Sequence, residues 1–217
     1  MSRLGPIAPG DVALRSRLTI DQLLWVANTR HGPGGHWFAR VHADAGDHDH
    51  LRDADDAVAY LTAHRVPLPE LRPTAGQLAR LASIRESVRA LTEPAAPPLS
   101  PAARTLVASA RFRIEPDGTL RSSADGWHGF MADLVPPLLQ LLELRDRLRV
   151  CGNPHCRLIF VDLSRNRRRR WCDSAGCGNR DRVARHRRAA QRTATRSSEA
   201  SPARRRPGRG PEGPPAD

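Results

Sequence analysis

The spacing of apolar residues predicts a mostly helical N-terminal part. Apolar side chains recur at steps of three and four residues, which places them on one face of an α-helix. The clearest such pattern runs from about Thr74 to Leu91. Three further helices are expected after Thr19, from Asp53 to His64, and from Gly129 to Leu144. Pro136 and Pro137 should kink the last of these or mark its true start, because proline interrupts the hydrogen bonds of a helix interior.

The pattern changes between Thr105 and Leu120. Prolines at positions 94, 97, 98 and 101 predict a stiff connector before this segment. Residues 106–110 are compatible with a helix, whereas residues 111–114 alternate as a strand does. The turn sequence Pro116-Asp117-Gly118 follows. We therefore predict a short β-hairpin across that turn.

The last third of the chain has a different pattern. Residues 157–162 favour a strand, and residues 164–172 are expected to form a turn and a return strand. Two short turns flank this hairpin. In the first, Gly152 permits a positive φ and Pro154 restricts the backbone. A helix is expected from Gly178 to about Arg188.

These elements predict a mainly α protein with small β content. A loose leader (residues 1–17) precedes an α-rich N-terminal domain (18–148). A small treble-clef-like module of β-hairpin and helix follows (149–192), and then an Arg/Pro-rich tail (193–217) whose composition predicts disorder. No apolar run is long enough for a membrane span, so we expect a cytoplasmic protein without a membrane partner.

The chain contains four cysteines, and all of them lie in the small module. Cys151 and Cys156 form one close pair, and Cys172 and Cys177 form a second pair with the same spacing. Two such pairs are typical of a tetrahedral Zn(Cys)4 site. A pair of disulfides, Cys151–Cys156 and Cys172–Cys177, is the alternative, but the cytosol disfavours it. We expect one structural Zn²⁺, because four thiolates leave no open position for catalysis.

Positive charge is concentrated around these cysteines. The formal net charge is +12, and residues 145–217 contain 20 arginines and 7 acidic residues, whereas residues 1–144 have a net charge of −1. The chain contains no lysine. Such asymmetry is typical of a module that binds a polyanion, with nucleic acid as the expected partner.

The nucleic-acid contacts are expected on the hairpin and on the following helix. Arginine forms bidentate hydrogen bonds with phosphate or guanine, and asparagine with adenine. Most of the arginines are expected to contact phosphate or solvent rather than bases. The candidates are Arg165, Arg167, Arg168, Arg169, Arg170, Asn179, Arg180, Arg187 and Arg188. Trp171 is expected to cover the zinc site rather than stack on a base. His155 is expected to face solvent or phosphate rather than bind the metal.

No other constellation predicts chemistry. Histidines are frequent between positions 31 and 50 (His31, His36, His42, His48 and His50), with Asp44, Asp47 and Asp49 among them. A second metal site is conceivable there, but we favour a polar loop, because the spacing matches no standard site. No nucleophile arrangement or phosphate-binding loop is present, so we expect no enzymatic activity.

The module resembles the CGNR zinc-finger family. The tetrapeptide Cys177-Gly178-Asn179-Arg180 gives that family its name, and the resemblance extends to residues 160–164 and 169–172. Upstream, Val26–Thr29 and Ile84–Arg89 resemble segments of the ABATE domain, the N-terminal half of these proteins. Asp181, directly after the tetrapeptide, is a departure, because a basic or neutral residue would suit DNA binding better at this position.

The resemblance implies a bacterial, stress-responsive transcription regulator. In this family the four cysteines bind zinc, the finger is presumed to bind DNA, and the N-terminal domain is presumed to sense or regulate. We therefore hypothesise a DNA-binding transcription regulator that is associated with the nucleoid. Double-stranded DNA is the expected partner, and a small-molecule effector of the N-terminal domain is a further expected one. The alternative is an RNA- or ribosome-associated protein that uses the same module and tail. Sequence does not specify the oligomeric state.

Overall fold

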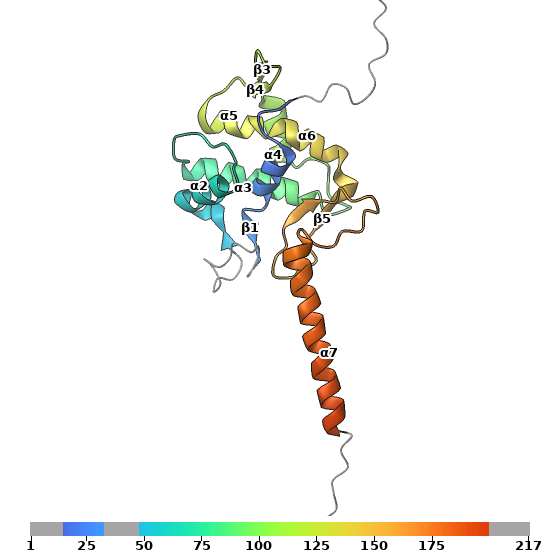
Figure 1. Cartoon of the computed structure of the whole chain (residues 1–217). Helices are drawn as coiled ribbons and strands as arrows, with labels where there is room; N and C mark the ends of the chain where they lie inside the picture. The colour runs from blue at the N-terminus through green and yellow to red at the C-terminus, as the bar shows by residue number, and fades with distance from the viewer. Residues whose placement is uncertain (1–14, 33–47, 200–217) are drawn as a thin grey trace, which may run out of the picture. The chain divides into compact units, whose positions relative to one another are not determined.

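The computed structural model describes residues 15–32 and 48–199 (Figure 1). Most of the expected leader, the expected tail beyond residue 199, and the histidines at positions 36 and 42 lie outside the described residues. Contacts divide the chain into two compact units, residues 1–178 and residues 179–217.

The described part of the chain is mainly helical, as predicted. Its α-helices are α1 (Ile20–Ala27), α2 (Ala54–Ala63), α3 (Ala75–Ala90), α4 (Pro101–Ser109), α5 (Gly126–Asp133), α6 (Val135–Glu143) and α7 (Asn179–Glu199). Short 3₁₀ turns η2 (His50–Arg52) and η3 (Arg145–Arg147) precede α2 and β5, and a π-helical turn η4 (Ser174–Gly178) precedes α7.

The described residues also form three small antiparallel sheets, each of two strands. They pair β1 (Arg30–His31) with β2 (His48–Asp49), β3 (Phe112–Ile114) with β4 (Leu120–Ser122), and β5 (Leu148–Val150) with β6 (Ile159–Val161). The predicted hairpin across Pro116-Asp117-Gly118 is confirmed as β3–β4. Gly118 has a φ of +81°, a conformation that glycine adopts without strain.

Side-chain caps explain where three of the predicted helices begin. Thr19 and Thr74 each form a capping box with the glutamine three residues later, Gln22 and Gln77. In α2 the Asp53 carboxylate accepts hydrogen bonds from the backbone N–H groups of residues 55 and 56. These caps satisfy amides that have no partner within the helix.

Two of the predicted elements begin or end at residues other than those expected. The helix expected over Gly129–Leu144 is two helices, and Pro136 and Pro137 mark the start of the second, α6. Proline fits the first turn of a helix because its nitrogen needs no partner there. For the same reason Pro101 begins α4, so it is not the end of a connector.

The core lies where α1 packs against α3 and α6. Its fully buried side chains include Leu18, Leu23, Val26, Leu81, Val88, Phe130, Leu134, Leu138 and Leu141. The apolar stripe predicted for residues 74–91 is confirmed as the buried face of α3, which also carries the buried Arg85. The Arg85 guanidinium donates to both carboxylate oxygens of Asp49, at 2.5 and 3.0 Å, and so attaches β2 to α3.

Strands β5 and β6 belong to this same core. Leu148 and Ile159 are buried in the cluster formed by the helices. The side-chain amide of Asn28, at the end of α1, donates to the Ile159 carbonyl (2.9 Å) and accepts from the Ile159 N–H (2.8 Å). Packing is therefore continuous across residue 148, and the division into domains 18–148 and 149–192 stays a prediction.

Replacement of Asn28 tests how strongly α1 holds β6. In Asn28→Ala the buried N–H and C=O of Ile159 lose their partners, and each unsatisfied group costs on the order of 1–3 kcal/mol. We expect the free energy of unfolding to fall by about 2–4 kcal/mol in urea titrations followed by circular dichroism.

The matched control is Thr74→Ala, which removes an exposed helix cap and should cost about 1 kcal/mol. Equal losses in the two variants would show that the Asn28 bridge does not hold the strand.

Candidate functional site

The first cysteine pair lies in a tight turn between β5 and β6. Cys151 follows β5 directly, and its N–H donates to the Leu158 carbonyl (2.8 Å). The Asn153 carbonyl accepts from the N–H of Cys156 (2.9 Å), while its side chain accepts from the N–H of His155 (3.0 Å). Both cysteine side chains are buried. The ladder β5–β6 therefore closes the turn that points two sulfurs in one direction.

The second pair is positioned by Asp173. Its carboxylate accepts from the N–H groups of Ala175 (3.0 Å) and Gly176 (2.8 Å), and its carbonyl accepts from the N–H of Gly178 (3.0 Å). These bonds curl residues 174–178 into η4, which carries Cys177. Asp173 was not singled out by the sequence, although an aspartate one residue after a cysteine is a recognisable turn signal.

The four sulfurs meet at one point. The Sγ atoms of all four cysteines lie within 4.8 Å of one another. Cys172 Sγ is 3.6 Å from Cys156 Sγ and 3.8 Å from Cys177 Sγ. Tetrahedral zinc with Zn–S bonds of about 2.3 Å requires sulfur–sulfur distances of about 3.8 Å. All four cysteines are free, so the disulfide alternative is wrong.

The sulfur cluster needs a cation to become four thiolates. Hydrogen bonds from Cys156 and Cys172 lower the pKa of Cys151 to about 2. The same bond to Cys151 raises the pKa of Cys156 to about 12, and the pKa of Cys172 is also raised, first by its bond to Cys151. Without a metal, one sulfur therefore ionises at the expense of its neighbours. A divalent ion at the centre makes all four ionise, and the site holds one structural zinc.

Trp171 packs over the metal site, as expected. It lies against the cluster of the cysteines, Leu158 and Phe160. A Cβ atom on Gly152 would come within 3.1 Å of the Trp171 ring, and one on Gly178 within 3.0 Å. Gly152 does not adopt the positive φ that its residue type permits, since among the described glycines only 118 and 126 have one. The glycine is needed because the indole leaves no room for a side chain.

The predicted return strand over residues 164–172 does not form. β6 pairs instead with β5, which precedes the first turn, and residues 162–173 have no strand. Propensity indicated the strand at 159–161 but not its partner, because pairing depends on contacts made elsewhere in the chain.

Asp162 shapes this strand-free segment. Its buried carboxylate accepts from the Ser164 N–H (2.9 Å), the Ser164 hydroxyl (2.5 Å) and the Arg169 N–H (2.8 Å). The hydrogen bond from the Ser164 hydroxyl lowers the pKa of Asp162, and the bonds from the two N–H groups lower it further. Residues 164–169 thus form a closed loop, in which Arg167 has a φ of +50°. We call residues 165–170 the arginine loop.

The arginine loop is exposed throughout, but its five arginines are not equivalent. Arg169 donates to the carbonyls of Trp171 and Cys172 and lies 5.1 Å from the centre of the Phe160 ring. Arg170 lies over Trp171 at 5.1 Å, and Arg167 pairs with Asp146 at 2.5 Å. Within the described chain, Arg165 and Arg168 have no acidic partner. These two are the arginines most available to an external anion.

Helix α7 carries the other predicted nucleic-acid contacts. Asn179, Arg180, Arg187 and Arg188 are all exposed. The Asn179 side chain accepts from Arg182 (3.2 Å), and Arg188 donates to the Ala184 carbonyl (3.3 Å). Asp181 forms an ion pair with Arg185 (2.9 Å). This pair neutralises the acidic residue that departed from the expected pattern.

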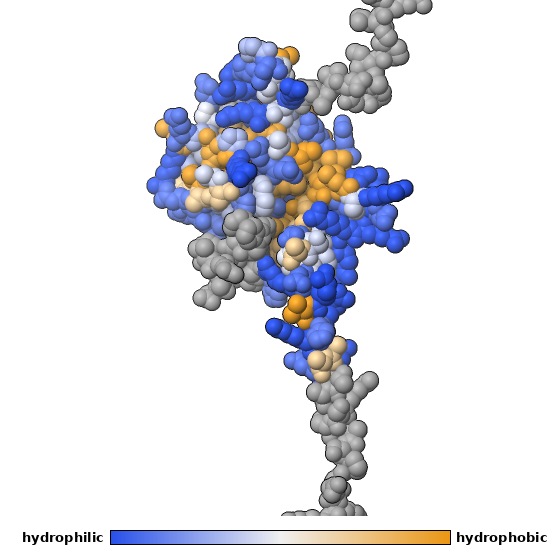
Figure 2. Space-filling model, in the orientation of Figure 1, coloured by the Kyte–Doolittle hydropathy of each residue, from blue (hydrophilic) through white to orange (hydrophobic). Residues whose placement is uncertain are grey.

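Hydrophilic residues cover much of the folded unit in Figure 2 and predominate on the coloured first part of α7, whereas hydrophobic residues emerge in a limited area of the visible face. α7 is also longer than expected, since it continues to Glu199, past residue 192. None of the described helices is both long and apolar enough to cross a membrane.

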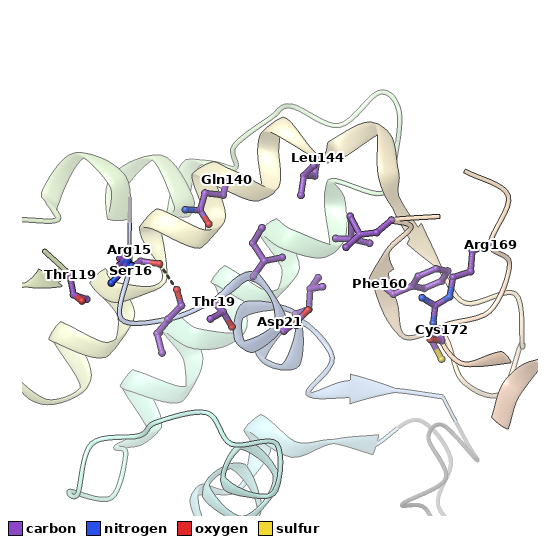
Figure 3. A pocket seen from close by; sticks show the side chains of 15 residues that line it. Arg15, Ser16, Thr19, Asp21, Thr119, Gln140, Leu144, Phe160, Arg169 and Cys172 are labelled. Carbon is purple, nitrogen blue, oxygen red and sulfur yellow. Dashed lines mark hydrogen bonds between the residues drawn. The ribbon is translucent and has the colours of Figure 1, made fainter. Parts of the chain in front are cut away.

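A groove of about 850 Å³ joins the helical part to the metal site (Figure 3). Thr19, Asp21 and Gln140 line it from the helices, and Arg169 and the zinc ligand Cys172 line it from the other side. Apolar walls with a few charged groups suit a small polar molecule.

The structure adds polar residues that sequence patterns did not assign to the site. Asn28 and Asp162 are buried and hold the backbone around the cysteines. A buried polar residue shows no periodicity of its own, so only the contact partner reveals its role. Asn28 does lie in the segment 26–29 that resembles the ABATE domain, and the bridge to Ile159 gives that segment a physical purpose.

Comparison with known families supports this description of the site. The model of the CGNR zinc finger matches residues 147–190, which include all four cysteines, the arginine loop and the first half of α7. Residues 147–190 form a CGNR zinc finger. No match identifies the ABATE domain, which stays a prediction, and no curated protein matches the chain.

Loss of one sulfur ligand should abolish metal binding by the finger. In Cys156→Ser we expect the sulfur-to-cobalt charge-transfer absorption of the Co²⁺-substituted protein to disappear. The free energy of unfolding should also fall, because β5 and β6 share the helical core.

His155→Ser is the control, since this exposed residue lies in the same turn. An unchanged cobalt spectrum there would confirm that His155 is no ligand. Retention of the charge-transfer band in Cys156→Ser would contradict the four-sulfur site.

Loss of the Asp162 charge should release the arginine loop. In Asp162→Asn one carboxylate oxygen becomes an NH2 group that faces an N–H or O–H donor instead of accepting from it. We expect faster amide hydrogen exchange over residues 164–170 with the metal retained. Asp146→Asn removes a charge from the exposed partner of Arg167 and should leave that exchange unchanged. Equal exchange in the two variants would show that the loop keeps its shape without Asp162.

Proposed function

We propose that this CGNR zinc finger binds double-stranded DNA and that the protein is a transcription regulator. The observation that carries the proposal is the arginine loop, which the zinc ligands and Asp162 hold in one conformation with Arg165 and Arg168 exposed. Such a loop loses little conformational entropy when its guanidinium groups contact phosphates. The net charge of +13 over residues 145–217 supplies the long-range attraction.

The proposed DNA contacts are of two kinds. Contacts with phosphate position the protein on the duplex, and contacts with base edges read the sequence. Arginines of the loop are suited to phosphate, because their planar guanidinium groups form bidentate hydrogen bonds with it. Arg187 on α7 is exposed and, among the described interactions, has no acidic partner, so it is the best candidate for a base contact. Asn179 is less suited than its residue type suggests, since its carbonyl oxygen accepts from Arg182.

The zinc is structural rather than catalytic in this proposal. Four sulfur ligands complete the coordination sphere and leave no place for an activated water. We accordingly propose no enzymatic reaction. A small-molecule effector would have a direct route to the finger through the groove of Figure 3, because Arg169 and Cys172 form part of its wall.

The salt dependence of binding tests the role of the arginine loop. Wild type and Arg165→Ala/Arg168→Ala are compared by fluorescence anisotropy on duplex DNA over a series of salt concentrations. Each phosphate contact contributes about 0.9 to the slope of log K against log salt, so the slope should fall by about 2. Circular dichroism and zinc content should be unchanged.

The matched control is Arg104→Ala/Arg121→Ala, which removes two exposed arginines from the helical part. It has the same net charge as the loop variant and should keep nearly the wild-type slope. If log K fell equally steeply with log salt in the two double variants, the protein would attract DNA through its overall charge, and the arginine loop would not be a docking surface.

Regulation requires defined sites in addition to affinity. Genomic fragments bound by the full chain should be enriched at particular sequences, and Arg187→Ala should lower that enrichment more than it lowers binding to random DNA. Tighter binding to structured RNA than to duplex DNA at matched salt would favour the RNA-associated alternative instead.

A further inference from the structure

A second cluster of metal-binding side chains lies at the β1–β2 sheet. His31 and His48 are paired across the two strands, and His50 follows in η2. The carboxylate of Asp56, in the first turn of α2, contacts two of these rings, with His48 Nε2 at 2.8 Å and His50 Nδ1 at 2.9 Å. Ligand atoms of His48, His50 and Asp56 all lie within 4.8 Å of one another.

The surroundings hold these side chains in place. Arg85 binds Asp49, the residue between His48 and His50, through both carboxylate oxygens. The Tyr60 ring stacks on His50 with 4.1 Å between ring centres, and its hydroxyl donates to the Asn28 carbonyl (3.0 Å). His50 is 4% exposed. A site supported in this way resembles a preorganised ligand set more than a solvated loop.

The rings of the cluster form a connected chain of contacts. The Gly32 carbonyl contacts His31 Nδ1 (3.1 Å), and His31 Nε2 contacts His50 Nε2 (3.1 Å). The contacts of His50 and His48 with Asp56 continue this chain, so the carboxylate and the three rings hold one another in place.

A metal ion fits this arrangement of donor atoms, because His48 Nε2 and His50 Nδ1 both face the Asp56 carboxylate. If the ion binds these three groups, His50 Nε2–H can donate to His31 Nε2 and His31 Nδ1–H can donate to the Gly32 carbonyl.

We propose that His48, His50 and Asp56 bind a second divalent transition-metal ion, separate from the zinc of the finger. Two imidazoles and a carboxylate suit Zn²⁺ and similar first-row ions. Donor atoms on a tetrahedral zinc are about 3.3 Å apart, so nitrogen–oxygen distances of 2.8 and 2.9 Å need only a small expansion to admit the ion. His31 orients His50 through its second ring nitrogen, as outer ligands of metal sites commonly do.

The site is linked to the finger by a short path. Gly32, which accepts from His31, donates its N–H to the carbonyl of the zinc ligand Cys156 (3.4 Å). A Cβ atom on Gly32 would come within 3.2 Å of the His155 carbonyl, so β1 lies directly against the first cysteine turn. Occupancy of the second site would therefore stabilise the backbone that carries the finger's ligands.

Metal stoichiometry of the full chain tests the proposal. The protein is stripped with a chelator under reducing conditions, reconstituted with Zn²⁺ or Co²⁺, and freed of weakly bound metal by gel filtration. We expect two equivalents in wild type and one in His48→Gln/Asp56→Asn. The lost equivalent should be the one that shows no sulfur-to-cobalt charge-transfer absorption.

His128→Gln is the control, because this exposed histidine contacts Arg80 far from the cluster in sequence and should keep two equivalents. One equivalent in wild type, or a second equivalent that survives in His48→Gln/Asp56→Asn, would overturn the proposal. X-ray absorption on wild-type zinc protein gives an answer that needs no variant. Two sites predict an average of two sulfurs per zinc, whereas the finger alone predicts four.

Discussion

Four sulfur atoms cannot stay within 4.8 Å of one another as thiolates unless a cation lies between them. This constraint governs the zinc finger. The pKa values of Cys151, Cys156 and Cys172 move in opposite directions because the sulfurs compete for protons. Zinc ends that competition and fixes both cysteine turns at once. Trp171, the glycines beside it and the arginine loop all take their positions from this arrangement.

The metal does not stabilise an isolated module. Leu148 and Ile159 are buried among the helices, and Asn28 bridges both backbone groups of Ile159. The sequence predicted a domain boundary near residue 148, and that division stays a prediction. The shared core couples metal binding to the stability of α1, α3 and α6. A change in the helical part can therefore reach the zinc ligands through few contacts.

Much of this could be predicted from sequence, for identifiable reasons. Cysteine spacing specifies the zinc site because four ligands in two close pairs have few other uses. The stripe over residues 74–91 specifies α3 because helical periodicity is a local property. The partner of β6 and the gathering of His31, His48, His50 and Asp56 depend on contacts between distant segments, and no local pattern carries them. The functions of Asn28 and Asp162 were hidden for the same reason.

The two metal-binding clusters differ in what surrounds them, and the difference has a functional consequence. Three of the finger's four cysteines are buried and Trp171 packs against them, so its zinc should exchange slowly and serve structure. In the histidine cluster, the side chains of Asp56 and His48 are 29% and 25% exposed. This cluster offers three nitrogen and oxygen ligands, whereas the finger offers four sulfurs. A site with three ligands and access to solvent binds its ion more weakly and more reversibly than a closed four-sulfur site. Gly32, directly after β1, connects the histidine cluster to the Cys156 turn. The occupancy of this weaker site can vary with metal supply while the finger stays folded.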